Sequence, residues 1–201
     1  MAAADAIKSK ETVELISNLL GKHRKPIYKD AFDLNMCLAL RAGDLLSLSY
    51  TDVINSDGSV KDYLIIKEEK TEDVKGKLAR KIKLTDKAKD IILKRRKQNP
   101  AHRFMFESDS NRSKGKPLTY KSLYRSFVYI STIVTDLTEE VIQFTTHSCR
   151  KTIGYFLWQQ NVKIEVICAL LNHSSPAVTM AYLGLVQEDV DNCYDLVEGL
   201  F

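Results

Sequence analysis

The chain has 201 residues, of which 44% are apolar and 28% are charged, with a formal net charge of +4. This balance is typical of a globular protein and excludes disordered and fibrous chains. The longest uncharged apolar run, residues 166–171, is far shorter than a bilayer span, and the first residues lack the apolar block of a secretory signal. The length suits one large domain, or one domain with a short appendage.

Charge is distributed unevenly along the chain. Residues 67–103 hold fourteen basic and six acidic side chains, residues 111–125 hold five basic and no acidic ones, and residues 183–201 hold five acidic and no basic ones. A basic middle and an acidic end fit a surface that binds a polyanion, although solvated helix faces give the same pattern. The four cysteines are scattered without a Cys-x-x-Cys pair, which predicts buried free thiols in a reducing compartment rather than disulfides.

Apolar periodicity predicts mostly helices. Ser9 is a suitable N-cap for the first helix, Pro26 suits the start of the second, and Gly43 allows a sharp change of direction after it. The helices are expected over residues 9–20, 26–41, 44–48, 85–97, 119–133, 147–160, 163–171, 176–182 and 188–200. Alternating residues predict strands at 60–66 and 77–84 joined by a charged hairpin loop, with a turn at 55–58 and a short third strand at 104–106. The fold class is therefore mostly α with a small antiparallel β-sheet (α+β).

Several charged residues stand where rigid elements would present them. Arg41 directly follows an apolar helix, and Asp44 lies three residues further on, where it could orient the guanidinium. His147 and Arg150 are spaced to share one face at a helix start, a place suited to phosphate binding. Taken singly, each of these is also an ordinary helix-surface residue.

The last candidates are His173, Tyr182 and Lys70. His173 follows an apolar helix, and Tyr182 comes nine residues later. A phenol with an ordinary pKa near 10 attacks poorly at neutral pH, so Tyr182 needs cationic neighbours to act as a nucleophile. Lys70 at the hairpin tip is a candidate proton donor. The sequence shows no metal-ligand spacing, phosphate-binding glycine loop or Gly-x-Ser-x-Gly motif, so we expect phosphate chemistry without metal or nucleotide cofactor.

Together these residues resemble an ordered set found in the tyrosine recombinases, the phage-integrase family. The resemblance covers roughly residues 27–185 and rests on Leu40-Arg41-Ala-Gly-Asp44, Lys70-Thr71, His147-x-x-Arg150, Leu171-Asn172-His173-Ser-Ser and Tyr182. It implies the catalytic-domain fold of that family and a site-specific recombinase that breaks and rejoins DNA without metal or ATP. The set departs from the family at Asn172, where many members have Gly.

The resemblance also implies a role for each matched residue. Tyr182 would attack the scissile phosphate and form a 3′-phosphotyrosine. Arg41, Arg150 and His173 would hold the non-bridging oxygens, and Asp44 would support the site without itself contacting the phosphate. His147 would assist proton transfer, and Lys70 would protonate the leaving 5′-oxygen, with Lys67, Lys75 and Lys77 as alternatives for that acid. The basic positions expected on DNA are Lys75, Lys77, Arg80, Lys114, Lys116, Lys121 and Arg125.

The expected organisation has three parts. Residues 1–25 form an N-terminal helical extension too short for the family's core-binding domain, residues 26–185 form the catalytic domain, and residues 186–201 form a C-terminal helix. The family implies that such a helix is exchanged between protomers of a synaptic tetramer, although packing on its own domain is equally open. The expected partner is double-stranded DNA, without a membrane. The expected location is the cytoplasm, in association with the nucleoid, for a protein encoded by a bacterium, an archaeon or a phage. A non-catalytic DNA-binding regulator and a type IB topoisomerase are the alternatives.

Overall fold

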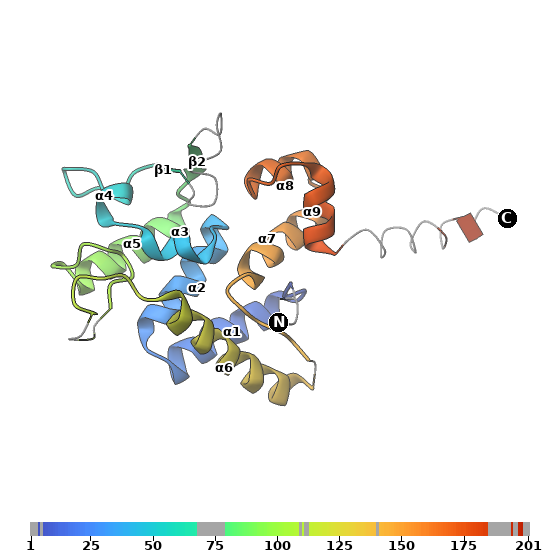
Figure 1. Ribbon diagram of the computed structural model, residues 1–201, viewed down its shortest axis with the longest axis horizontal. Coiled ribbons are helices and arrows are strands. Elements are labelled where there is room, and N and C mark those ends of the chain that lie inside the picture. The colour runs from blue at the N-terminus through green and yellow to red at the C-terminus, as the bar shows by residue number, and fades with distance from the viewer. Residues whose placement is uncertain are drawn as a thin grey trace.

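The computed structural model describes residues 4, 6–67, 79–108, 110, 113–139, 141–184, 194, 197 and 198. This part of the chain is mostly helical with a two-stranded antiparallel sheet, as predicted (Figure 1). The elements are α1 (Lys10–His23), α2 (Pro26–Leu38), α3 (Ala42–Ser47), α4 (Tyr50–Val53), β1 (Tyr63–Ile66), β2 (Arg80–Lys83), α5 (Asp86–Gln98), α6 (Tyr120–Thr138), α7 (Ser148–Gln159), α8 (Ile164–Leu170) and α9 (Pro176–Leu183). No helix in these ranges is long and apolar enough to cross a bilayer.

Helix α2 is the centre of the main core. It packs against α1, α5 and α7, and α1 also packs against α6. Phe32 of α2 meets Phe127 of α6 and Phe144 edge-to-face, with ring centroids 6.0 and 5.5 Å apart, and all three rings are buried. Burial of such rings contributes most of the apolar area that stabilises a core of this size.

The N-terminal segment belongs to the same core. Ser9 caps α1 as predicted, because its side chain accepts a hydrogen bond from the Thr12 amide at 3.2 Å. Ile7 is 2% exposed, and its amide donates to the Thr152 hydroxyl of α7 at 2.8 Å. Ile7, just before α1, is thereby tied to α7, 145 positions away.

The sheet is a single hairpin with Tyr63 paired to Lys83 and Ile66 paired to Arg80. Residues 68–78, which carry the predicted hairpin loop, lie outside the described residues. The predicted third strand at 104–106 is wrong: Phe104 makes one isolated bridge with Ser49, and the two residues after it are buried in the core. This consecutive apolar run reflects burial in the core rather than strand pairing.

Helices α7, α8 and α9 form a second, smaller apolar cluster beside the main core (orange to red in Figure 1). Ile167, Leu171 and Leu183 are its buried residues, together with Ala39 at the end of α2. α8 and α9 pack on each other and on α7. The predicted helix at 188–200 lies largely outside the described residues.

Candidate active site

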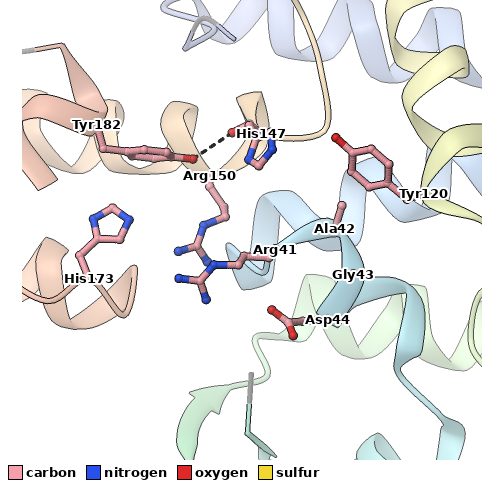
Figure 2. Close-up of a pocket in the computed structure, with 9 residues that line it drawn as sticks. All are labelled: Arg41, Ala42, Gly43, Asp44, Tyr120, His147, Arg150, His173 and Tyr182. Carbon is pink, nitrogen blue, oxygen red and sulfur yellow. Dashed lines mark hydrogen bonds between the residues drawn. The ribbon is translucent and has the colours of Figure 1, made fainter. Parts of the chain in front are cut away.

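One cavity collects residues from four distant parts of the chain. Its volume is about 350 Å³, and Figure 2 shows the side chains that line it. The lining residues are Arg41, Ala42, Gly43, Asp44, Tyr120, His147, Arg150, His173 and Tyr182. Six of them were predicted as catalytic or supporting residues: Arg41, Asp44, His147, Arg150, His173 and Tyr182. The remaining predicted catalytic residue, Lys70, lies outside the described residues.

Arg41 reaches the cavity through a tight turn between α2 and α3. α2 ends at Leu38, earlier than predicted, and Ala39 adopts a left-handed conformation with φ of 51°. The buried Asn35 side chain accepts a hydrogen bond from the Leu40 amide at 2.9 Å, which fixes the chain after this turn. The change of direction therefore occurs at Ala39 rather than at Gly43, which lies inside α3.

Arg150 is buried beneath the cavity, with 2% of its surface exposed. Its guanidinium donates hydrogen bonds to the carbonyl oxygens of Ala39 and Leu171. These two carbonyls lie at the C-terminal ends of α2 and α8, where backbone oxygens have no partner inside the helix. A single cation at both negative helix ends joins the main core to the α7–α9 cluster.

The end of α8 sets the position of His173. The amides of His173 and Asn172 donate to the carbonyls of Cys168 and Ala169, each at 3.1 Å, which is the Schellman pattern. That pattern requires a left-handed residue after the helix, and Asn172 has φ of 51°. Gly suits this position best and Asn tolerates it, which explains physically why Asn172 can stand where the family often has Gly.

Thr179 orients the imidazole of His173. Its hydroxyl oxygen lies 3.0 Å from Nδ1 of His173 and 3.3 Å from the Ser175 carbonyl oxygen. A hydroxyl has one proton, and the carbonyl can only accept it, so Nδ1 is best placed as the donor to Thr179.

Tyr182 lies across the cavity from Arg41 in Figure 2. Its hydroxyl donates to the His147 carbonyl at 3.4 Å, and its ring packs edge-on against His173 with centroids 4.9 Å apart. Burial raises the pKa of the Tyr182 phenol, and the nearby guanidiniums of Arg150 and Arg41 oppose that rise. The phenol therefore keeps its proton at neutral pH and must lose it during any attack.

Tyr120 is a lining residue that sequence reasoning missed. It begins α6, and its hydroxyl oxygen accepts a hydrogen bond from the buried Thr146 hydroxyl at 3.1 Å. Its ring stacks on Tyr124 with centroids 6.1 Å apart. The N-cap Thr119 was recognisable in the sequence, but no motif marks the residue after an N-cap as facing a site.

The predicted DNA contacts fall into three groups. Lys75 and Lys77 lie outside the described residues. Arg80 donates a hydrogen bond to the Leu170 carbonyl. The remaining residues are exposed on the loop before α6 and on its first turns: Lys114, Lys116, Lys121 and Arg125.

The described residues contain no group of three or more His, Cys, Asp or Glu side chains that could hold a metal ion. Three cysteines fall within these ranges, Cys37, Cys149 and Cys168, and all are free thiols, as predicted. Cys149 lies between His147 and Arg150 in the sequence but is fully buried, and burial raises its pKa to about 12. It is therefore an inert core residue rather than a second nucleophile.

Comparisons with known proteins identify the family. The sequence profile of the phage integrase family matches residues 6–188. A probable integrase/recombinase of Bacillus subtilis strain 168, YoeC, is 31% identical over 201 residues, which is the full length of both chains.

Solved structures show the same fold. XerA recombinase superposes with a TM-score of 0.69 at 14% identity, covering 98% of this chain and 64% of that one. The Tn1549 transposon integrase bound to transposon right-end DNA gives 0.69 at 15% identity, covering 96% and 66%. A lambda integrase dimer bound to a core site gives 0.65 at 18% identity, covering 91% and 49%. The chain thus spans about two thirds or less of these solved chains, and it belongs to the phage integrase family, the tyrosine recombinases.

Proposed function

We propose that this protein is a site-specific DNA recombinase that cuts and rejoins strands through a 3′-phosphotyrosine, without metal or ATP. One observation supports it above all: the Tyr182 phenol opens onto the same cavity as Arg41, Arg150 and His173. A phosphodiester in that cavity would meet an attacking oxygen and several cationic or hydrogen-bonding groups at once. Fixed charges of this kind stabilise the transition state without having to reorganise.

The proposed step exchanges one phosphorus–oxygen bond for another. The Tyr182 oxygen bonds to phosphorus and passes its proton to the imidazole of His147, and the bond from phosphorus to the 5′-oxygen breaks. Arg41, Arg150 and His173 hold the non-bridging oxygens, while Lys70 gives the 5′-oxygen its proton. The energy of the broken bond is retained in the phosphotyrosine, so the reverse attack by a 5′-hydroxyl rejoins DNA without ATP.

Arg41 and Arg150 also favour loss of the Tyr182 proton during the attack. Burial keeps Tyr182 protonated, and the proposed negative charge on the attacking oxygen develops beside two guanidiniums that oppose that effect. The backbone carbonyl of His147 accepts the phenol hydrogen bond and orients Tyr182. We assign the imidazole of His147, a residue that lines the same cavity, to assisting proton transfer. Asp44 is buried beside Arg41 in the cavity wall, and we assign it to supporting that side chain.

The proposed partner is double-stranded DNA, which would be met in the cytoplasm. The basic residues Lys114, Lys116, Lys121 and Arg125 are exposed on the loop before α6 and on its first turns, and α6 begins with the cavity residue Tyr120, so we expect them to contact phosphates. Related structures were solved on DNA, one as a dimer on a core site. We further propose assembly into a tetramer on DNA through residues 186–201.

The test is trapping of the covalent adduct. The protein is incubated with a library of nicked duplexes of random sequence, and denaturation-resistant complexes are isolated and sequenced. Wild type and the control Tyr129→Phe, which removes an exposed phenol on α6, should form the adduct, and Tyr182→Phe should not. An adduct that persists in Tyr182→Phe would show that another nucleophile acts.

Two other results would point to the alternatives. Specific DNA binding with no adduct on any duplex would indicate a regulator that kept the fold but lost the chemistry. Relaxation of a supercoiled plasmid without a preferred site would indicate a type IB topoisomerase.

A further inference from the structure

Two consecutive carbonyls at the end of α8 each accept a hydrogen bond from an arginine of a different element. Arg150 of α7 donates to Leu171, and Arg80 of β2 donates to Leu170. The second contact joins residues 90 positions apart. His173 follows two residues after Leu171, held by the Schellman hydrogen bond to Cys168. The backbone that presents His173 is therefore fixed from two sides.

Arg80 bridges a space that apolar packing leaves open. β2 and α8 face each other across a cavity of about 510 Å³ lined by Arg80, Ile82, Val166 and Leu170, among others. The buried apolar contacts of α8 are made with α7, α9 and Ala39. A guanidinium placed at the last turn of α8 also meets the negative end of that helix. Its bond to Leu170 thus ties the hairpin to the α7–α9 cluster.

We propose that Arg80 is a positioning residue that acts through His173, and not a contact to DNA. This inference rests on the proposed function, since it assigns Arg80 a part in holding His173 against the phosphate. The guanidinium keeps the α8 end, and with it the imidazole, in register with the two arginines of the cavity. Loss of that bond displaces His173 while leaving the DNA-binding surface of α6 intact.

The first measurement separates DNA affinity from the rate of the chemical step. Arg80→Met should slow adduct formation at saturating protein by about tenfold to a hundredfold, since small displacements in a preorganised site have effects of that size. Its affinity for a nicked duplex and the salt dependence of that affinity should match wild type. Arg80→Lys should restore part of the rate. The matched control is Lys81→Met, which removes a charge from the opposite face of β2, where the Lys81 ammonium lies 4.1 Å from the Tyr63 ring centroid.

A DNA contact predicts the reverse. In that case Arg80→Met would weaken binding, reduce the slope of log affinity against log salt by about one, and leave the rate at saturation unchanged. That result would overturn the proposal. The melting temperature should stay within about 3 °C of wild type, which excludes general unfolding as the cause.

A double-mutant cycle tests whether Arg80 works through His173. In a His173→Gln background, Arg80→Met should change the rate by about twofold at most, because the residue it positions is already gone. If the rate of the double variant instead falls by the product of the two single-variant factors, Arg80 and His173 act independently, and the proposal is overturned. Absence of any adduct with wild type would instead overturn the proposed function, and this inference with it.

Discussion

Replacing Arg150 should cost stability as well as activity, because its guanidinium joins two parts of the fold. In Arg150→Met the carbonyls of Ala39 and Leu171 lose their donor, and both residues are buried, at 2% and 0% exposure. An orphaned buried acceptor costs about 1–3 kcal/mol, and removal of a buried cation returns part of that. We expect a loss of about 2–4 kcal/mol in the free energy of unfolding, about 4–16 °C in melting temperature for a chain of this length.

Thermal and urea unfolding followed by circular dichroism measure this loss. Arg150→Lys should retain part of the stability, since an ammonium keeps the charge but cannot span both carbonyls as a planar fork does. Arg125→Met removes the same charge from an exposed site and should change stability by less than about 0.5 kcal/mol. Amide exchange at residues 167–173 should accelerate in Arg150→Met. If Arg150→Met unfolds at the wild-type midpoint, the two hydrogen bonds do not hold the clusters together.

Two further substitutions test the packing behind Tyr182 and the loop before α6. Gly154→Ala would place Cβ 2.6 Å from the side chain of Leu183, the neighbour of Tyr182. We therefore expect slower adduct formation and a free energy of unfolding lower by about 1–2 kcal/mol, and adding Leu183→Val should relieve both effects. Effects that persist in the double variant would show that this clash is not their cause. Burial alone would raise the pKa of the Glu107 carboxyl, yet hydrogen bonds from the amides of Arg103, Phe104 and Gly115 bring it below its usual range. A depressed pKa stabilises the fold at pH values above the unfolded pKa of about 4.3, and that stabilisation disappears as the pH falls through the folded pKa. The free energy of unfolding of Glu107→Gln should therefore be about 1–3 kcal/mol below that of wild type at pH 7, and urea titrations should show the difference shrinking towards pH 3. A difference that stays constant with pH would exclude the carboxylate as its source.

Local signals in the sequence predicted most elements because capping and periodicity act within a few residues. The cap at Ser9, the proline at the start of α2 and the cap at Thr119 all mark helix starts in the structure. Helix α4 was missed although Ser49 and Asp52 form a capping box there, because four residues are too few to show periodicity. Element ends were harder to predict, as α2 shows, because Ala39 is held by the distant Arg150.

The site was predictable to the extent that its residues stand in recognisable sequence motifs. Arg41, His147, Arg150, His173 and Tyr182 all line one cavity, and order along the chain was enough to group them. Tyr120 belongs to no such motif, and the tertiary contact between α6 and the segment before α7 places it at the cavity. Arg80 shows another limit: composition marks it as a basic residue for DNA but gives no sign of its hydrogen bond to the Leu170 carbonyl.

The geometry of Arg150 changes how a loss of activity should be interpreted. A guanidinium that donates to two helix ends shapes the cavity before any phosphate arrives. An inactive Arg150 variant is therefore expected whether the side chain binds the phosphate, holds α8 in place, or does both. Stability and amide exchange report the structural part alone, and the adduct rate reports the sum. Amide exchange gives the fraction of molecules in which α8 is packed in its native place. If Arg150→Met lowers the adduct rate by a larger factor than it lowers that fraction, the remainder is the contribution of Arg150 to the chemical step.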